Sequence, residues 1–362
     1  MKTLNYGLIG CGMMGREHLS NLALLPATNV AAIFEPDAGM AAQAQAMAPG
    51  TKMVGSIAEL LAVDALDALI IASPNHCHAA QLIQIAATRA LPVLVEKPLF
   101  TDPADGPALA ALGASYGAPI WVAMEYRYMP PIAALLDRVE SATGGPLMLS
   151  IREHRFAFLD KVGNWNRFNR NSGGTLVEKC CHFFDLMRLI LKAEPVRVMA
   201  SAGQAVNHKG EIYDDTESDI WDSGYVLIDF DSGAKAMLEL CMFADGSRYQ
   251  EEFSVVGPTG KIEAFVPGAA QHWSPDLGDL PVPKVVLSPR DQSGFEVLET
   301  PVDPTILKAG SHNGSTFFEH QKFAAVLRGE GTVEVTLEDG AKAVAMGQAA
   351  QQSALTGQAV DM

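Results

Sequence analysis

A lysine that directly follows an apolar run is the first residue in this chain suited to proton chemistry. Residues 93–95 predict a buried strand, and Glu96-Lys97-Pro98 comes next. Burying an ammonium costs free energy unless the group is paired or its pKa falls, and a lysine with a lowered pKa can exchange protons near neutral pH. Three residues alone are a weak motif, and a strand end with a solvated Glu-Lys pair explains them more simply. The lysine therefore needs support from the rest of the chain.

A histidine four residues after a glutamate offers a second group for proton transfer. Gly173-Gly174 precedes a helix predicted over residues 176–191, which contains Glu178 and His182. At this spacing both side chains lie on one helical face, so the carboxylate can orient the imidazole. The glycine pair permits close approach to a ligand or a sharp entry into the helix. A surface Glu-His pair is the alternative.

A glycine-rich turn near the start of the chain predicts a dinucleotide site. Gly10-Cys11-Gly12-Met13-Met14-Gly15 follows the apolar run 4–9, and Glu35 comes twenty residues after Gly15. Gly10 permits a tight turn, Gly12 lets the backbone approach a diphosphate, and Gly15 permits close packing of helix on strand. A carboxylate at Glu35 can bind the ribose hydroxyls and repel a 2'-phosphate, which favours NAD over NADP. Asp37 could take over this ribose contact.

A second turn is expected to add polar groups at the same sheet edge. Ser73-Pro74-Asn75 and His78 follow the apolar run 68–71, and open α/β sheets bind ligands where their parallel strands end. His78 could equally cap a helix or be buried for structural reasons. The predicted NAD-binding residues are Gly10, Cys11, Gly12, Met13, Met14, Gly15, Glu35, Ser73, Pro74, Asn75, His78, Glu96 and Lys97.

The order of apolar runs predicts an α/β fold with two domains. In residues 1–123, strand-like runs alternate with helix-like stretches, as in a parallel sheet with helices on both faces. In residues 124–362 the runs are longer and joined by turns such as Asp231-Ser232-Gly233, which predicts a largely antiparallel sheet. The proline-rich segment 267–304 predicts a long loop or flap. Strands are expected at residues 4–9, 30–34, 68–71, 93–95, 120–123, 147–158, 196–206, 218–230, 234–243 and 251–256, and helices at 40–47, 78–88, 107–116, 176–191, 316–327 and 337–354.

Composition and charge argue against several classes of protein. The chain has 362 residues, of which 48% are hydrophobic, so it is long enough for two globular domains. A net charge of −16 argues against binding to nucleic acid or to acidic membranes. Without an apolar run of membrane-spanning length or a signal-peptide pattern, a cytoplasmic protein is expected. The five cysteines lack metal-ligand spacing, so we expect reduced thiols and no metal site.

In combination, these motifs resemble the glucose-fructose oxidoreductase and inositol dehydrogenase family (Gfo/Idh/MocA) over essentially the whole chain. The resemblance implies an N-terminal Rossmann domain with a doubly wound parallel sheet, and a C-terminal α/β domain with a large, mostly antiparallel open sheet. It also implies a catalytic lysine at Lys97 and an acid and histidine at Glu178 and His182. The acid is usually Asp in similar proteins, so the longer Glu178 could partner His182, Lys97 or the substrate. The motifs that carry the resemblance are the glycine loop, Ser73-Pro74-Asn75 with His78, Glu96-Lys97-Pro98, Tyr126-Arg127-Tyr128 with Pro130, and Gly173-Gly174 with His182 and Asp185.

The residues and the resemblance together indicate an NAD-dependent dehydrogenase. Oxidising an alcohol by hydride transfer needs a group that takes the hydroxyl proton, and Lys97 and His182 are the candidates. We expect oxidation of a secondary alcohol of a sugar, sugar acid or cyclitol to a ketone. His182 is the favoured base, with Glu178 orienting it and Lys97 polarising the oxygen. Predicted substrate contacts are Arg127, Arg152, Trp165, Arg167 and His312.

Several alternatives stay open at this point. The basic stretch 152–170 is either a solvated face or the wall of a pocket, and His312 is either a substrate contact or a surface loop residue. Tightly held NAD could instead assist glycoside elimination by transient oxidation, or the chain could sense NAD or sugar without activity. A sheet with helices on one face needs cover on the other, and similar proteins pair through it, so a homodimer or homotetramer is expected.

Overall fold

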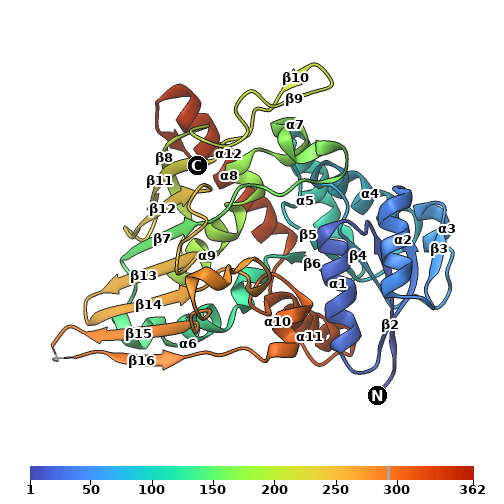
Figure 1. The fold of residues 1–362 in the computed structure, drawn as a ribbon, viewed down its shortest axis with the longest axis horizontal. Helices are drawn as coiled ribbons and strands as arrows, with labels where there is room; N and C mark the ends of the chain where they lie inside the picture. Colours follow the sequence, from blue (N-terminus) through green and yellow to red (C-terminus); the bar gives the residue numbers. More distant parts are fainter. Residues whose placement is uncertain (292–293) are drawn as a thin grey trace.

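The N-terminal sheet of the computed structural model, which describes residues 1–291 and 294–362, is a six-stranded parallel sheet. Its strand order β3-β2-β1-β4-β5-β6 is that of a Rossmann domain, as predicted (Figure 1). The order reverses between β1 and β4, which places the ends of these strands at the position where open α/β sheets bind ligands. The strands are β1 Leu4–Ile9, β2 Thr28–Phe34, β3 Lys52–Val54, β4 Ala68–Ile71, β5 Val93–Glu96 and β6 Ile120–Ala123.

The helices of this domain follow the predicted alternation with strands. Sequence analysis missed only the short elements β3 and α3, whose three and five residues give little periodic signal. Ser56 caps α3 by accepting a hydrogen bond from the amide of Glu59. The helices are α1 Met13–Leu24, α2 Ala38–Met47, α3 Ile57–Leu61, α4 His78–Thr88 and α5 Gly106–Ser115, with 3₁₀ turns η1 Asn75–Cys77 and η2 Pro103–Asp105.

The second sheet has nine strands in the order β16-β15-β14-β13-β7-β12-β11-β8-β17. Only β7 and β12 pair in parallel, so the sheet is mostly antiparallel, as predicted. Asp231-Ser232-Gly233 forms the predicted hairpin between β11 and β12. The strands are β7 Met148–His154, β8 Pro195–Gly203, β11 Ser223–Phe230, β12 Lys235–Cys241, β13 Glu251–Gly257, β14 Gly260–Val266, β15 Lys284–Pro289, β16 Glu296–Glu299 and β17 Val360–Asp361, beside a separate ribbon of β9 Ile212–Tyr213 and β10 Thr216–Glu217.

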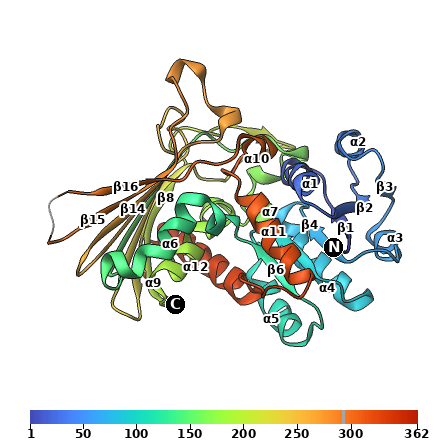
Figure 2. The same cartoon turned by 90° about the horizontal axis from the view of Figure 1, so that it is seen from below.

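Helices cover one face of this large sheet and leave the other open (Figure 2). The C-terminal helix α12 contacts β8 of the large sheet and β6 of the parallel sheet, so it packs between the two domains. On β11, Val226 and Ile228 are buried whereas Tyr225 and Leu227 are exposed, so the open face is partly apolar. The helices here are α6 Pro130–Thr143, α7 Asn169–Ser172, α8 Thr175–Glu178, α9 Cys181–Leu191, α10 Pro304–Ala309, α11 Ser315–Leu327 and α12 Leu337–Thr356, with 3₁₀ turns η3 Glu125–Tyr128, η4 Val162–Arg167, η5 Ala270–His272 and η6 Pro275–Leu277.

Two sequence predictions for the second domain were wrong, and one long helix was not predicted. The segment 267–304 is not one long loop, because β15 and β16 extend the sheet. Both strands are short, and prolines on either side of the apolar run Val285-Val286-Leu287 hid β15. The helix predicted over 176–191 is interrupted between α8 and α9. Helix α6 was not among the expected helices. It begins at Pro130-Pro131, and proline is well suited to the first turn of a helix.

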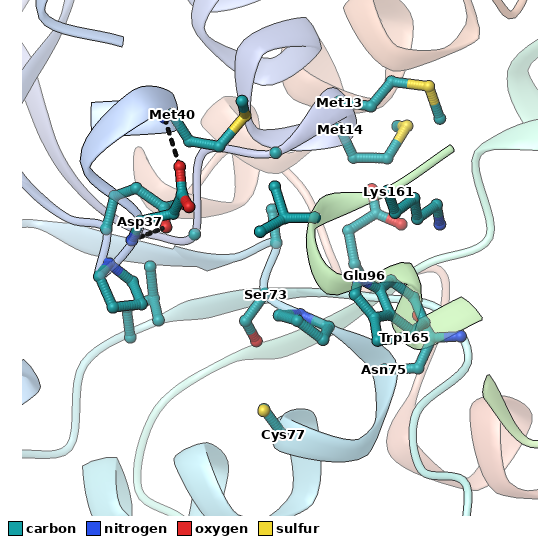
Figure 3. Close-up of a pocket in the computed structure, with 18 of the residues that line it drawn as sticks. Met13, Met14, Asp37, Met40, Ser73, Asn75, Cys77, Glu96, Lys161 and Trp165 are labelled. Carbon is teal, nitrogen blue, oxygen red and sulfur yellow. Dashed lines mark hydrogen bonds between the residues drawn. The ribbon is translucent and has the colours of Figure 1, made fainter. Parts of the chain in front are cut away.

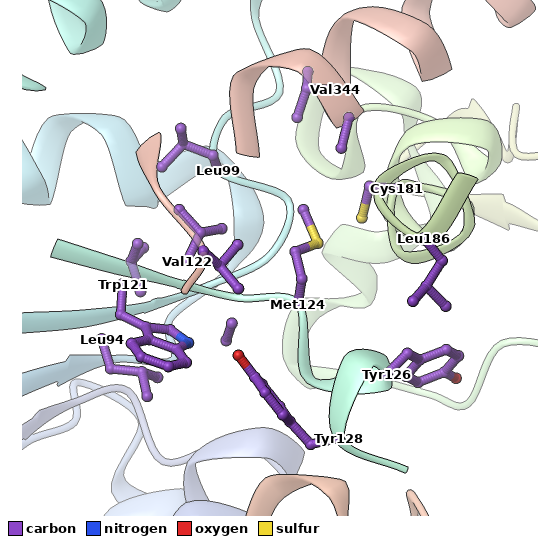
Figure 4. Packing of buried hydrophobic residues seen from close by; sticks show 14 of the residues in the cluster. Leu94, Leu99, Trp121, Val122, Met124, Tyr126, Tyr128, Cys181, Leu186 and Val344 are labelled. Atoms are coloured by element: carbon purple, nitrogen blue, oxygen red, sulfur yellow. The ribbon is translucent and has the colours of Figure 1, made fainter. Parts of the chain in front are cut away.

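A continuous apolar core joins the two domains (Figure 4). Trp121 and Val122 of β6 pack in the same cluster as Leu186 of α9 and Val344 of α12. The amide of Val122 also donates to the carbonyl of Val335 over 3.1 Å, so the C-terminal segment closes against the first sheet. The boundary between residues 123 and 124 stays a prediction. In the described ranges, no helix is long and apolar enough to cross a membrane.

Candidate active site between the two domains

A cavity of about 460 Å³ lies at the ends of the parallel strands (Figure 3). Residues from the first domain form most of its wall, and Asp160, Lys161, Val162 and Trp165 close it from the second domain. Most of the residues predicted to bind NAD line this cavity. They are Gly10, Gly12, Met13, Met14, Glu35, Ser73, Pro74, Asn75, Glu96 and Lys97.

The three glycines of the loop perform different structural tasks. Gly10 has a φ of +88°, and a Cβ there would lie 2.6 Å from the amide nitrogen of Ser73. A Cβ on Gly15 would lie 2.2 Å from the carbonyl oxygen of Gly10, so only glycine permits this approach of α1 to the turn. At Gly12 a Cβ would meet no atom of the described residues within 4 Å. The open space beside Gly12, at the N-terminus of α1, fits the diphosphate of a dinucleotide.

The acid at the end of β2 fixes the glycine loop. Glu35 Oε2 accepts a hydrogen bond from the amide of Cys11 over 2.5 Å, and Glu35 Oε1 accepts one from the amide of Asp37 over 2.8 Å. Asp37 in turn caps α2 through the amide of Met40. Both carboxylates line the cavity. The prediction for Cys11 is corrected, because its side chain is fully buried and does not line the cavity.

His78 also differs from its prediction, since it is buried behind the cavity. Its Nδ1 lies 2.8 Å from the carbonyl oxygen of Pro98, and its Nε2 lies 3.0 Å from that of Ser73. The ring therefore ties two cavity-lining turns together and does not face a cofactor. Asn75 does line the cavity, and its side-chain amide donates to the carbonyl of Ser172 over 3.1 Å, which links the two domains.

Lys97 is held as an ammonium. Its Nζ donates to the backbone carbonyl of Glu178 over 3.1 Å. Burial acts to lower the pKa of Lys97, but the Cys181 sulfur and the carboxylates of Glu96 and Glu178 outweigh burial and raise this pKa above its usual value. Of the two possibilities that the sequence left open, a paired ammonium or a lysine with a lowered pKa, the structure shows the first. An ammonium can donate a hydrogen bond to an oxygen but cannot accept a proton.

Glu96 supports Lys97 through a buried chain of hydrogen bonds. Its Oε2 accepts from the amide of Lys97 over 3.2 Å, and its Oε1 lies 3.0 Å from Nε2 of His18. His18 Nδ1 lies 2.9 Å from Nε2 of His320 on α11. Burial acts to raise the pKa of Glu96, but the contact with His18 lowers it, so a carboxylate remains beside Lys97.

His182 is the opposite case, a buried neutral imidazole. Burial first, and then the positive charges of Lys97 and Lys179, lower its pKa well below the usual value. Its ring stacks on that of Tyr126 with centroids 4.0 Å apart and an interplanar angle of 7°. Within the part of the chain that the structure describes, its Nδ1 has no hydrogen-bond partner. A neutral ring with a free nitrogen can accept a proton.

Glu178 does not orient His182, which corrects the sequence prediction. Helix α8 ends at Glu178 and α9 begins at Cys181, so the two residues do not share one regular helix. Glu178 Oε1 instead pairs with Nζ of Lys161 at 3.1 Å, and its Oε2 is buried without a partner among the described residues. The glycine pair before α8 serves the sharp entry into the helix, because both Gly173 and Gly174 have a φ of +85°.

His312 reaches the same region from the loop before α11. Its Nδ1 lies 3.0 Å from Glu17 Oε1 and 3.3 Å from Glu125 Oε1. Burial opposes its charge, but the two carboxylates raise the pKa of His312 to about 9. Its ring lies 5.9 Å from that of Tyr126. His312 is thus a cation near His182, and its predicted substrate contact stays a prediction.

A buried ionic cluster behind Tyr126 was missed by sequence analysis. Lys179 Nζ bonds the hydroxyl of Tyr126 and lies 2.8 Å from Glu153 Oε1. Burial, and then the charge of Glu153, raises the pKa of the neighbouring Glu251 to about 7. The two glutamates are paired across β7 and β13 and face inward with Phe253. Their positions on the buried face of alternating strands were the available signal.

Three predicted substrate contacts need correction. Arg152 lies on the open face of the large sheet, where it pairs with Glu252, because alternate residues of β7 point away from the helices. Arg167 is buried and binds the carbonyl of Phe158 and the carboxylate of Asp160, so it shapes the loop beside the cavity. Arg127 is used in a buried ion pair. Trp165 lines the cavity, with Lys161 over its ring at 4.4 Å.

The ion pair of Arg127 is structural. Arg127 Nη2 lies 2.5 Å from Asp185 Oδ1, its Nε lies 2.6 Å from Asp185 Oδ2, and its Nη1 donates to the carbonyl of Glu334. The Asp185 side chain is fully buried. The guanidinium therefore fastens η3 to α9 and to the segment before α12.

Arg127→Met is expected to lower the free energy of unfolding by about 3–5 kcal/mol, because it leaves the buried Asp185 without its partner. Arg152→Met is the matched control, since its ion pair is half exposed and should contribute under about 1 kcal/mol. Urea unfolding followed by circular dichroism measures both. Equal small losses in the two variants would contradict a structural role for Arg127.

The comparisons with known proteins match both domains. The family model "Oxidoreductase family, NAD-binding Rossmann fold" matches residues 4–124, and "Oxidoreductase family, C-terminal alpha/beta domain" matches residues 142–362. An inositol 2-dehydrogenase of Corynebacterium glutamicum (strain R) is 35% identical over 156 residues, which span 42% of this chain and 46% of that relative. An inositol 2-dehydrogenase of Leifsonia xyli is 29% identical over 274 residues, which span 75% of this chain and 76% of that relative.

Solved structures share the fold over the full length. A levoglucosan dehydrogenase in complex with NADH and levoglucosan has a TM-score of 0.81, with 22% identity over 99% of each chain. GenD2 from gentamicin A biosynthesis, in complex with NAD, has a TM-score of 0.79, with 21% identity over 100% of this chain and 97% of that chain. The two family models, which together span nearly the whole sequence, show that this chain belongs to the Gfo/Idh/MocA oxidoreductase family, with an NAD-binding Rossmann domain at its N-terminus.

Proposed function

We propose that this protein is an NAD-dependent dehydrogenase that oxidises a secondary alcohol of a sugar or cyclitol to a ketone. The observation that carries the proposal is the combination of a charged Lys97 at the cavity wall and a buried, neutral His182, whose pKa is lowered by burial and then by the charge of Lys97. Alcohol oxidation needs a donor to the substrate oxygen and an acceptor for its proton, and these two groups supply both. NAD, when bound, accepts the hydride.

In the proposed mechanism, the ammonium of Lys97 donates a hydrogen bond to the substrate hydroxyl oxygen. This contact stabilises the negative charge that develops as the proton leaves. The neutral ring of His182 accepts that proton. Tyr126 stacks on the imidazole and holds it parallel to its own ring. The positive charge of His312, whose ring lies 5.9 Å from that of Tyr126, can bind another hydroxyl of the substrate.

The substrate class and the cofactor preference rest on different observations. The names of the relatives, two inositol 2-dehydrogenases and a levoglucosan dehydrogenase, support a polyhydroxylated ring as substrate. The carboxylates of Glu35 and Asp37 at the cavity wall would repel a 2'-phosphate and therefore support NAD over NADP. A homodimer or homotetramer that covers the open sheet face also stays a prediction.

An absorbance screen at 340 nm tests the proposed function. Inositols, aldoses, glycosides and sugar acids are offered with NAD and, separately, with NADP. We expect NADH formation with at least one inositol or pyranose, and slower reduction of NADP. Substrate consumption with tightly retained NAD and no net NADH would instead support NAD-assisted glycoside elimination. NAD binding without turnover of any compound would contradict the proposal.

A further inference from the structure

The pair of Lys161 and Glu178 joins the cofactor cavity to the catalytic region. Lys161 Nζ lies 3.1 Å from Glu178 Oε1 and 4.4 Å from the ring centroid of Trp165. Figure 3 shows Lys161 and Trp165 at the cavity, near Glu96. The Lys161 side chain is 22% exposed, whereas that of Glu178 is 5% exposed. The lysine therefore has room to move, and the glutamate does not.

Glu178 is only partly satisfied by this contact. Its Oε2 is buried and has no partner in the described ranges, although a buried carboxylate oxygen without a hydrogen bond is costly. Its backbone carbonyl accepts the hydrogen bond from Lys97. Glu178 thus contacts both lysines of the cavity wall, Lys97 through its backbone carbonyl and Lys161 through its carboxylate.

Lys161 is the cation that the second domain contributes to the cavity wall. Among the described residues, three cationic side chains line the cavity. Arg16 donates to the carbonyl of Cys11 and the sulfur of Met40, Lys97 donates to the backbone carbonyl of Glu178, and Lys161 pairs with the Glu178 carboxylate. An ammonium has three N–H donors, and Glu178 takes only one from Lys161. The remaining N–H groups of Lys161 can therefore donate hydrogen bonds to a diphosphate in this cavity.

We propose that Lys161 is a cofactor-binding and positioning residue whose ammonium is shared between Glu178 and the anionic part of NAD. Without NAD, Lys161 pairs with Glu178. With NAD bound, the phosphates draw the ammonium toward them, and the Glu178 carboxylate becomes available to the reacting groups. The length of Glu178 permits this arrangement, because its extra methylene, compared with Asp, brings the carboxylate to Lys161. The inference rests on the proposed function only for the turnover measured with it.

Calorimetric titration of the whole chain with NAD tests the sharing directly. Lys161→Met, which keeps the apolar stem on Trp165, should weaken NAD binding by about 10- to 100-fold, since it removes a hydrogen bond to a charged group. The variant should also lose part of the salt dependence of binding. Lys161→Arg should restore most of the affinity. Lys235→Met, on an exposed side chain paired with Asp229, is the matched control and should bind NAD as the unchanged protein does.

Glu178→Gln separates sharing from a merely structural ion pair. If Glu178 competes with NAD for Lys161, this variant should bind NAD several-fold more tightly while its kcat falls, and the gain should vanish in the double variant with Lys161→Met. Weaker NAD binding in Glu178→Gln, or unchanged binding in Lys161→Met, would overturn the proposal. Because these are binding measurements, they stand even if the absorbance screen finds no substrate, a result that would contradict the dehydrogenase function alone.

Discussion

His182→Ala is expected to lower kcat by about 10²- to 10⁴-fold, because the variant removes the proposed proton acceptor. NAD should bind with unchanged affinity, since His182 is not one of the residues that line the cofactor cavity. Stopped-flow or steady-state absorbance with the substrate found in the screen measures the loss. His154→Ala is the matched control, since His154 lies on the open face of the large sheet and pairs with Glu239. A kcat equal to that of the control would contradict the role of His182.

The pH dependence of kcat should also identify His182 as the base. Burial lowers the pKa of His182, so the ring is neutral at neutral pH and gains a proton only in more acidic solution. A base works when unprotonated, so kcat should be constant near neutral pH and fall as the pH drops through an apparent pKa below about 6.5. This acid limb should disappear in His182→Ala. An acid limb that persists unchanged would show that another group accepts the proton.

The parts of the site that could be predicted from the sequence are those set by local backbone geometry. The glycine loop, Glu35 and the turn at Ser73 follow directly from strand ends, so their spacing in the sequence indicated their meeting at one cavity. Lys97 was found for the same reason. Parallel strands in a Rossmann order bring their carboxyl ends to one edge of the sheet, so these residues can be placed together without knowledge of contacts between distant segments.

The parts that could not be predicted depend on contacts between distant segments. The spacing of Glu178 and His182 predicted one helical face. The helix is instead interrupted between them, and Lys161 binds the Glu178 carboxylate. Arg127 looked like a pocket residue, but Asp185, far along the chain, fixes it in the core. Tertiary packing determines which group pairs with a buried charge, and spacing in the sequence does not reveal that partner.

The pKa of Lys97 is a further case of this kind. Burial alone would favour a neutral amine, and the isolated motif left open whether Lys97 is neutral or paired. The carboxylates of Glu96 and Glu178 and the sulfur of Cys181 reverse the sign, and of these only Glu96 is adjacent in the sequence. The raised pKa divides the two proton-handling groups: the charged lysine donates a hydrogen bond, and the neutral histidine accepts the proton.

Lys97→Met should therefore lower kcat by about 10²- to 10³-fold, the cost of removing one donor to a developing oxyanion. The acid limb of the pH profile should remain, because His182 is still present. Since the pKa of Lys97 is raised, its charge is retained up to strongly alkaline pH, so the unchanged protein should show no limb from this lysine near neutrality.

Comparison of the two variants decides which residue is the base. Lys192→Met, on an exposed side chain paired with Glu140, controls for loss of a surface charge and should keep full activity. If Lys97 were the base, its replacement would abolish the acid limb and His182→Ala would preserve it, the reverse of our expectation. The assignment thus depends on the shape of the pH profile. The size of the activity loss cannot decide it, since removing a hydrogen-bond donor and removing a base both reduce turnover by similar factors.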